Sequence, residues 1–477
     1  MKLTNAALGR LPIPAPGYDR SEIGIGIAHF GVGGFHRAHQ AAYLDRLLDQ
    51  GLARDWGICG VGVLPADRRM RDVLRAQDGL YTLVVQHPDG RRDPRVIGSI
   101  VDYRYAPDDP QKVIELLAAP GTRIVSLTIT EGGYQDPDGP AFALITAALA
   151  RRRDRGLTAP TIMSCDNIEH NGEVARRAVT MHAERRDPGL ADWITEHARF
   201  PNSMVDRITP LTTPDVAAAL DRDCGVADGW PVVTEPFSAW VLEDDFAAGR
   251  PPWERAGVLL VDDVSPYELM KLRLLNAGHQ CLAYFGYLCG YRWVADAAND
   301  PLLAELLRGY FVSEAAPTLH PVPGIDLAEY QRTLIARFAN PGVRDTIARL
   351  CAHASDRIPK WLLPVIRANL ARGAPIRLAA AAVAAWARYA EGIDERGRPI
   401  EVVDRLAESL VPLARSQRSH PTAFIENTAL FGDLAGQPRF VAAYRWTLDS
   451  LHRRGARATL EALLGKEGAS GQGAGDR

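Results

Sequence analysis

The chain has 477 residues, of which 47% are hydrophobic and 24% charged, and its formal net charge is -3. This composition predicts a globular protein of two or three domains, without the basic excess of nucleic-acid-binding proteins. The six cysteines form no CxxC pair, no apolar run is long enough to cross a bilayer, and the N-terminus lacks the apolar core of a signal peptide. We therefore expect a soluble, cytoplasmic protein that binds neither nucleic acid nor membrane.

The first half of the chain alternates strand-like and helix-like segments. Helices are predicted at 37–51, 67–77 and 140–156, and further strands at 231–244. The main predicted strands are 22–34, 56–63, 80–88, 123–130 and 161–165. This order predicts an α/β fold, a Rossmann-type doubly wound and mainly parallel sheet.

The pattern changes near Val261, after which it is helical almost throughout. We expect a Rossmann-type NAD-binding domain over 1–264 and a mostly α-helical substrate domain over 265–464. The Gly-rich, polar end, 465–477, is predicted to be disordered.

A glycine turn, HFGVGGFHRAH (29–39), follows the first strand and opens the first helix. Gly31 and Gly33 fit the first two glycines of a dinucleotide-binding turn, in which the second leaves room for pyrophosphate. The third glycine position holds His36, so the fingerprint is imperfect. A glycine-rich strand end without a ligand is the alternative.

Asp67 follows the second predicted strand, where a carboxylate usually binds the adenosine ribose. An acid there favours NAD because it repels the 2′-phosphate of NADP, although Arg68 and Arg69 soften that preference. The alternative is that Asp67 caps a helix beginning at Arg68.

Two further polar residues follow predicted strands, Glu131 after 123–130 and Asn167 after 161–165. Ligands of open α/β sheets bind beyond the carboxyl ends of the strands. We therefore expect both residues near the cofactor, although strand ends are polar in most proteins.

The segment from Ser265 reads as a buried helix with polar residues on one arc. At about 100° per residue, Glu268, Lys271, Asn276 and His279 share that arc with leucines. A shared cavity explains them best. The alternatives are a lysine that extends to solvent, a core histidine, an amide bonded to a helix carbonyl and a helix-capping glutamate.

These groups suit a metal-free alcohol oxidation. A lysine in a low-dielectric pocket beside a positive nicotinamide ring gives up its proton readily, and so can act as a general base. Asn167 and Asn276 can donate to the developing oxygen, and His279 can fix a neighbouring hydroxyl. Tyr267 and Lys271 form the YxxxK pair of short-chain dehydrogenases, but past the expected domain boundary. No HExxH, CxxC or compact Cys/His/Glu cluster predicts zinc.

Five motifs carry a resemblance: GVGGFHRAH, TITEGGY, SCDNIEHNG, FPNSMVDRITP and KLRLLNAGHQ, in this order. In this combination the chain resembles the mannitol dehydrogenase family, the polyol-specific long-chain dehydrogenases, over nearly its whole length. The resemblance implies an N-terminal Rossmann domain, a C-terminal helical domain, NAD as cofactor and no metal.

The resemblance also implies residue roles. Lys271 matches the general base, Asn167 and Asn276 the amides around the reacting oxygen, and His279 the histidine that orients the substrate. Glu131 and Glu268 match carboxylates linked to proton passage. The expected cofactor-binding residues are Gly31, Val32, Gly33, Phe35, His36, Arg37, Asp67 and Glu131.

Three matches concern the substrate. Asp206 matches a pocket residue, although a structural pairing with Arg207 is equally plausible. Arg349 matches a substrate-contacting arginine. Arg357 stands where lysine is common, so a planar fork replaces a point charge and leaves substrate preference open.

We expect reversible NAD-dependent oxidation of an acyclic polyol to a ketose by a monomer, with mannitol to fructose favoured. The alternatives are oxidation of D-arabinitol or sorbitol, reduction of the hexuronates fructuronate or tagaturonate, and a nucleotide-binding regulator without catalysis.

Overall fold

The computed structural model describes residues 1–136 and 138–466. The chain divides into two compact units, Met1–Ser265 and Pro266–Arg477. Of the segment predicted to be disordered, residues 467–477 lie outside the described residues. Within the described part of the chain, no helix is both long and apolar enough to span a membrane.

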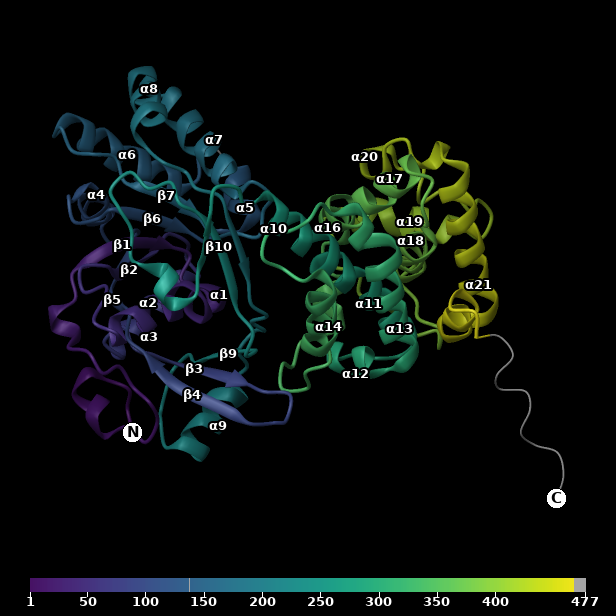
Figure 1. Cartoon of the computed structure of the whole chain (residues 1–477), viewed down its shortest axis with the longest axis horizontal. Helices are drawn as coiled ribbons and strands as arrows, with labels where there is room; N and C mark the ends of the chain where they lie inside the picture. The colour runs from purple at the N-terminus through teal and green to yellow at the C-terminus, as the bar shows by residue number, and fades with distance from the viewer. Residues whose placement is uncertain (137, 467–477) are drawn as a thin grey trace. The chain divides into compact units, whose positions relative to one another are not determined.

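The first unit is built on a five-stranded parallel sheet with the order β5-β2-β1-β6-β7 (Figure 1). The chain winds outward from β1 to one side and from β6 to the other, so the strand order reverses between these two neighbours. This confirms the predicted Rossmann-type doubly wound sheet. Its strands are β1 (Ile25–Phe30), β2 (Gly57–Gly62), β5 (Ile100–Tyr105), β6 (Ile124–Leu127) and β7 (Thr161–Ser164).

Alternating side chains of the strands enter two cores, as the period of two in a strand requires. Ala28 and Phe30 of β1 pack with residues of α4, α6, α7 and α8, whereas Ile27 packs with residues of α2 and α3. The helices of this unit are α1 (Gly34–Ala38), α2 (Gln40–Asp49), α3 (Asp67–Ala76), α4 (Pro110–Ala118), α5 (Thr130–Gln135), α6 (Pro140–Asp154), α7 (Asn171–Glu184), α8 (Pro188–His197) and α9 (Pro214–Cys224), with 3-10 turns at Asn5–Arg10, Arg20–Glu22 and Trp253–Ala256.

One detail of the sequence-based prediction needs correction. The predicted strand 80–88 is β3 (Tyr81–Gln86), but it belongs to a separate three-stranded sheet, β4-β3-β9, and β5 takes the edge of the main sheet. The strands predicted over 231–244 are confirmed as β9 and β10 of the same unit, where they belong to two small sheets. The remaining strands are β4 (Arg92–Ile97), β8 (Ser203–Asp206), β9 (Val232–Thr234), β10 (Ala239–Glu243) and β11 (Leu259–Val261).

The second unit is helical, as predicted, and the Ala-rich helix α18 (Arg377–Tyr389) is buried along almost its whole length. It packs against α11 (Ala277–Leu288) and against the long helix α21 (Pro438–Leu463), which bends at Gly455. Two six-residue π-helices, Lys271–Asn276 and Tyr310–Ala315, interrupt the α-helical pattern. The other helices are α10 (Ser265–Met270), α12 (Val294–Asn299), α13 (Pro301–Gly309), α14 (Leu327–Phe338), α15 (Ile347–Cys351), α16 (Ala354–Trp361), α17 (Leu363–Ala371), α19 (Ala407–Ser416) and α20 (Thr428–Phe431), with 3-10 turns at Ala316–Thr318 and Leu434–Gly436.

Candidate functional site

Glycine stands at positions 31 and 33 of the turn after β1 for different physical reasons. Gly31 has φ +87°, and a Cβ there would lie 2.1 Å from the carbonyl oxygen of Thr128, so the protein itself requires glycine. Gly33 has φ -93°, and its nearest neighbour, the carbonyl oxygen of Gly31, would lie 3.8 Å from an added Cβ. Neither conformation nor packing requires glycine at 33, so its open backbone fits the close approach of a pyrophosphate.

The histidine at the third position of the fingerprint belongs to a buried imidazole pair. His36 stacks on His29 of β1 with ring centroids 3.4 Å apart, and the His29 nitrogens lie 2.8 Å from the Ser126 hydroxyl and 2.9 Å from that of Thr128. Burial lowers the pKa of both histidines, that of His29 to about 3, so the pair is neutral at pH 7. A third glycine would allow the strand and the helix to pack closely. Here the stacked imidazoles of β1 and α1 take its place.

The other predicted residues of the turn face the protein. Val32 is buried, and Phe35 stacks on His39 with centroids 5.0 Å apart. The buried Arg37 donates through its guanidinium to the carbonyl of Trp230 and lies over the ring of the same residue. These contacts attach α1 to the start of β9 and indicate a supporting role for Arg37.

Asp67 holds the loop after β2 with one carboxylate oxygen. Its Oδ2 accepts hydrogen bonds from the amides of Val63 and Leu64, each 2.8 Å long. Helix α3 begins at Asp67 itself, so this carboxylate reaches back into the loop rather than capping a helix from Arg68. Oδ1 accepts no hydrogen bond from the described residues, which leaves an acceptor for a ribose hydroxyl. The guanidinium carbon of Arg69 lies 4.1 Å from the ring centroid of Trp230, and this cation–π contact holds the positive charge over that ring.

Glu131 and Asn167 lie beyond the ends of neighbouring strands. Glu131 is in the first turn of α5, after β6, and Asn167 follows β7; both are exposed. Because β6 and β7 are parallel and adjacent, the first unit brings these residues to the same edge of its sheet, next to the glycine turn after β1.

Asp166 is a residue of this edge that the sequence reasoning missed. It is 7% exposed, and its carboxylate accepts hydrogen bonds from the amides of Ile129 and Thr130 and from the Tyr134 hydroxyl. Burial raises its pKa to about 6. The signal was available, because an acid directly after the buried strand TIMSC needs specific partners.

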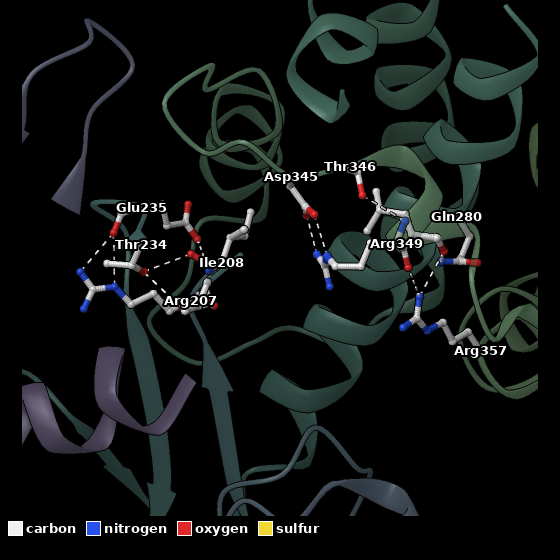
Figure 2. A network of polar contacts seen from close by, with 11 residues as sticks. Arg207, Ile208, Thr234, Glu235, Gln280, Asp345, Thr346, Arg349 and Arg357 are labelled. Atoms are coloured by element: carbon white, nitrogen blue, oxygen red, sulfur yellow. Dashed lines mark hydrogen bonds and ion pairs between the residues drawn. The ribbon is translucent and has the colours of Figure 1, made fainter. Parts of the chain in front are cut away.

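Asp206 is the buried last residue of β8, but it does not form the pairing with Arg207 that was an alternative for it. In the described chain, the guanidinium of Arg207 donates instead to the carbonyl oxygen of Glu235 (Figure 2) and to that of Ala38. A purely structural Asp–Arg pair therefore does not account for the buried Asp206.

In the second unit, Glu268, Lys271, Asn276 and His279 are all buried. Lys271 is 7% exposed, so its side chain does not extend into solvent. Lys271 and Asn276 are the first and last residues of a π-helix, a wider turn closed by i to i+5 hydrogen bonds that occurs frequently at functional sites. This turn brings residues five apart closer to one face than the α-helix that the sequence predicted.

Asn276 offers a buried amide donor. Its side chain is 5% exposed, and its Nδ2 has no hydrogen-bond partner among the residues that the structure describes. Leaving a buried amide donor unpaired costs about 1–3 kcal/mol, which a substrate oxygen would recover. His279 stacks on Phe338 with ring centroids 4.0 Å apart, which sets the plane of its imidazole.

The π-helix with Lys271 is fastened at its middle. The buried Tyr310 donates its hydroxyl hydrogen to the carbonyl of Arg273, 2.9 Å away, and the Arg273 guanidinium donates to the carbonyl of Thr318. A π-helix shifts the backbone ladder, and buried carbonyls need partners, so these bonds stabilise the unusual turn.

The two predicted substrate arginines make protein contacts (Figure 2). Arg349 pairs with both carboxylate oxygens of the buried Asp345. Arg357 donates to the carbonyls of Arg349 and Leu350, each 3.1 Å away, and Gln280 also donates to the Leu350 carbonyl. Arg357 of α16 thus binds the end of α15, and Gln280 ties that end to α11, which also carries His279. Among residues 1–136 and 138–466, no three His, Cys, Asp or Glu side chains are arranged to hold a metal ion.

Comparisons with known proteins cover both units. The family model for the mannitol dehydrogenase Rossmann domain matches residues 25–255, and that for the mannitol dehydrogenase C-terminal domain matches 263–452. The chain is 44% identical to a mannitol 2-dehydrogenase of Phaeosphaeria nodorum, over 96% of this chain and 85% of that protein. A mannitol 2-dehydrogenase of Aspergillus fumigatus is 42% identical, over 95% and 96% of the two chains.

Two solved structures are similar over their full length. Pseudomonas fluorescens mannitol 2-dehydrogenase, in a ternary complex with NAD and D-mannitol, is 43% identical with a TM-score of 0.90, covering 98% of this chain and 100% of that one. A D-sorbitol dehydrogenase in substrate-free form is 35% identical with a TM-score of 0.83, covering 96% and 100%. Both units match and the identity extends along the whole length, so the chain belongs to the mannitol dehydrogenase family.

Proposed function

We propose that this chain oxidises mannitol to fructose reversibly, with Lys271 as the general base and without a metal. In coarser terms it is a polyol dehydrogenase, an oxidoreductase that uses NAD, as its family and its 43% identity to an enzyme solved with NAD and D-mannitol support. The observation that carries the proposal is the π-helix, which holds a buried lysine at one end and, at the other, a buried amide whose Nδ2 has no partner among the described residues.

The residues of the first unit fit NAD. The open backbone at Gly33 admits the pyrophosphate, and Oδ1 of Asp67 is available to a ribose hydroxyl. A carboxylate at that position would repel a 2′-phosphate, which favours NAD over NADP. When bound, NAD supplies the acceptor for the hydride that leaves the carbinol carbon.

The polar residues of both units supply the proton chemistry in this proposal. Lys271 takes the proton of the reacting hydroxyl, and Asn276 and Asn167 donate amide hydrogens to the oxygen as it becomes a carbonyl. His279, held by Phe338, orients a second hydroxyl.

The remaining predicted residues have supporting roles in the proposal. Glu268 and Glu131 pass protons from the lysine to water. Asp206 and Arg349 contact the sugar chain, and Arg357 holds the end of the helix that carries Arg349.

The rival functions differ in how the structure bears on them. Sorbitol oxidation is the second candidate, because a D-sorbitol dehydrogenase matches with a TM-score of 0.83. A hexuronate reductase needs a free cation for the substrate carboxylate. Here Arg349 is paired with Asp345, and Arg357 donates to two carbonyls. A regulator without catalysis has no use for the buried Lys271.

A substrate panel tests the proposal. Initial rates are measured with NAD and with NADP on mannitol, D-arabinitol and sorbitol, and in reverse on fructose, fructuronate and tagaturonate. We expect the highest kcat/KM with mannitol and NAD, unchanged after dialysis against a chelator. Lys271→Ala should lower kcat at least about 100-fold with NAD affinity retained, because it removes the base.

Lys112→Ala is the matched control, because that lysine forms an exposed pair with Asp109; it should behave like the wild type. Turnover of uronates alone would overturn the choice of substrate. Near-normal turnover by Lys271→Ala would remove the lysine from its role.

A further inference from the structure

The carboxylate of Asp166 joins two loops at the sheet edge of the first unit. Its Oδ1 accepts the amide hydrogen of Thr130 at 2.7 Å, and its Oδ2 accepts those of Ile129 at 3.1 Å and of the Tyr134 hydroxyl at 2.8 Å. All three donors belong to the segment 129–134, which follows β6, whereas Asp166 itself follows β7. One buried acid therefore attaches the β6 loop to the end of the neighbouring strand.

Thr130 is held in a conformation that threonine avoids. Its φ is +64°, in the left-handed region, which costs a β-branched residue about 1–2 kcal/mol. The amide of this residue is the one that makes the 2.7 Å bond to Asp166. The carboxylate thus compensates for a strained backbone immediately before Glu131.

The chemistry of Asp166 is unusual for a residue that only fills space. Its described partners are neutral amide and hydroxyl donors, and burial raises the pKa of its carboxyl to about 6. Burying a carboxylate without a cation is costly, and an apolar residue would fill the same volume more cheaply. A residue kept at that cost is one whose bonds to a particular segment matter.

The position of these bonds indicates what they serve. Asp166 directly precedes Asn167 in the sequence. Thr130, whose backbone Asp166 holds, directly precedes Glu131. We propose that Asp166 is a positioning residue that fixes Glu131 relative to Asn167 by holding the backbone of the segment 129–134. This inference rests on the proposed function, in which Asn167 contacts the reacting oxygen and Glu131 passes protons.

The carboxylate is specifically required because its two oxygens accept three hydrogens. In Asp166→Asn one oxygen becomes an NH2 group, which would face a donor, so at least one buried amide or hydroxyl loses its acceptor. Thr130 can then relax toward negative φ, which displaces Glu131. Thr130→Gly removes the reason to relax, because glycine adopts positive φ without a steric penalty. Adding it to Asp166→Asn should therefore restore part of what the first substitution loses.

The experiment compares four full-length proteins: wild type, Asp166→Asn, Asp166→Asn with Thr130→Gly, and the control Asp109→Asn. Asp109 also accepts a backbone amide, that of Lys112, but at the exposed start of α4. The measurements are kcat and KM for mannitol, the NAD dissociation constant, and hydrogen–deuterium exchange of peptides covering 128–135.

We expect Asp166→Asn to lower kcat about 10- to 100-fold, the scale of a misplaced group, with NAD affinity within about twofold of wild type. Exchange in 128–135 should accelerate. The double variant should regain several-fold in kcat and slow the exchange again, and Asp109→Asn should match the wild type in all measurements.

The inference is overturned if Asp166→Asn keeps wild-type exchange in 128–135, or if exchange accelerates while kcat stays within twofold of wild type. A variant whose kcat and NAD affinity fall together, without recovery in the double variant, would also overturn it, because that is general loss of folding. If the wild type turns over no substrate of the panel, the proposed function fails instead. The exchange data still decide whether Asp166 holds the segment.

Discussion

Single side chains at the sheet edge combine two tasks, and Asp67 shows how they can be separated. One of its oxygens holds the amides of Val63 and Leu64, and the other is available to a ligand. The same residue therefore shapes the loop after β2 and, in our proposal, selects the cofactor. Substitutions that remove only the charge should affect only the second task.

Asp67→Asn keeps one acceptor for the loop amides but has no charge to repel a phosphate. We expect its preference for NAD over NADP, as a ratio of kcat/KM values, to fall at least about tenfold, with stability within about 1 kcal/mol of wild type. Asp67→Ala should lose the preference and in addition about 1–3 kcal/mol, because two loop amides lose their acceptor. Kinetics with both cofactors and denaturant unfolding measure the two effects.

Asp72→Asn, an exposed acid on the same helix, is the control for this pair. If Asp67→Asn discriminates against NADP as strongly as the wild type, another group contacts the ribose.

Asp67 and Gly31 could be predicted as cofactor-binding residues because a known turn fixes their spacing from the strands, and their roles stay predictions. Asp166 was not predicted, because only its neighbour, the amide Asn167, was expected to have a role at that strand end. The sequence also could not reveal the strain at Thr130, since φ at one threonine follows from a hydrogen bond to a residue 36 positions away.

At the scale of elements, the π-helix Lys271–Asn276 is the main departure from the predicted pattern. The apolar periodicity predicted an uninterrupted helix, because a wider turn leaves no signature in a segment that is buried on every side. Its stability depends on a partner from another helix, the hydroxyl of Tyr310 on the Arg273 carbonyl. Only the folded structure brings these residues, 37 positions apart, together.

Tyr310→Phe tests this dependence. It removes the hydroxyl donor from the partly buried carbonyl of Arg273, so we expect a loss of about 1–3 kcal/mol in unfolding free energy. We also expect kcat to fall about tenfold or more, because the turn that carries Lys271 loosens. NAD affinity should not change.

The control is Tyr291→Phe, which removes the hydroxyl bond to Asp300 in the same unit but outside the π-helix. It should lower stability with kcat unchanged. Equal kcat values for the two variants would show that Tyr310 contributes stability alone.

The strands show the same limit of local pattern. The segment 80–88 has a stronger apolar pattern than Ile100–Tyr105, which contains Asp102 and Arg104. Yet β5 pairs with β2 in the main sheet, and β3 forms a hairpin with β4. A mixed pattern of apolar and charged residues suits an edge strand, which is exposed to water on one side. Nothing local to either segment, however, determines the sheet that it joins.

At the scale of the whole molecule, the chain is two units with separate interiors. The first has its own cores on both faces of its main sheet, and the second is organised around the buried α18. The alternation of strands and helices identified the first unit from sequence, because the rules for parallel sheets are strict. The order of packing in the second unit could not be predicted, since short buried helices can pack in many ways.

A fragment of residues 1–265 should therefore fold cooperatively and bind NAD, because the glycine turn and Asp67 lie within it. It should not oxidise mannitol, since Lys271 and Asn276 lie outside it. Circular dichroism, NAD titration and rate assays check the three statements. An unfolded fragment would show that the first unit depends on the second.

The π-helix has an evolutionary consequence. A turn closed from i to i+5 contains one residue more than a turn of the α-helix. Loss of a single in-frame codon between Lys271 and Asn276 would place the lysine and the amide four residues apart, a spacing that a regular α-helix also brings to one face. One insertion or deletion event, rather than a series of point mutations, is thus enough for a lineage to gain or lose the π-helix while these two side chains keep a common face.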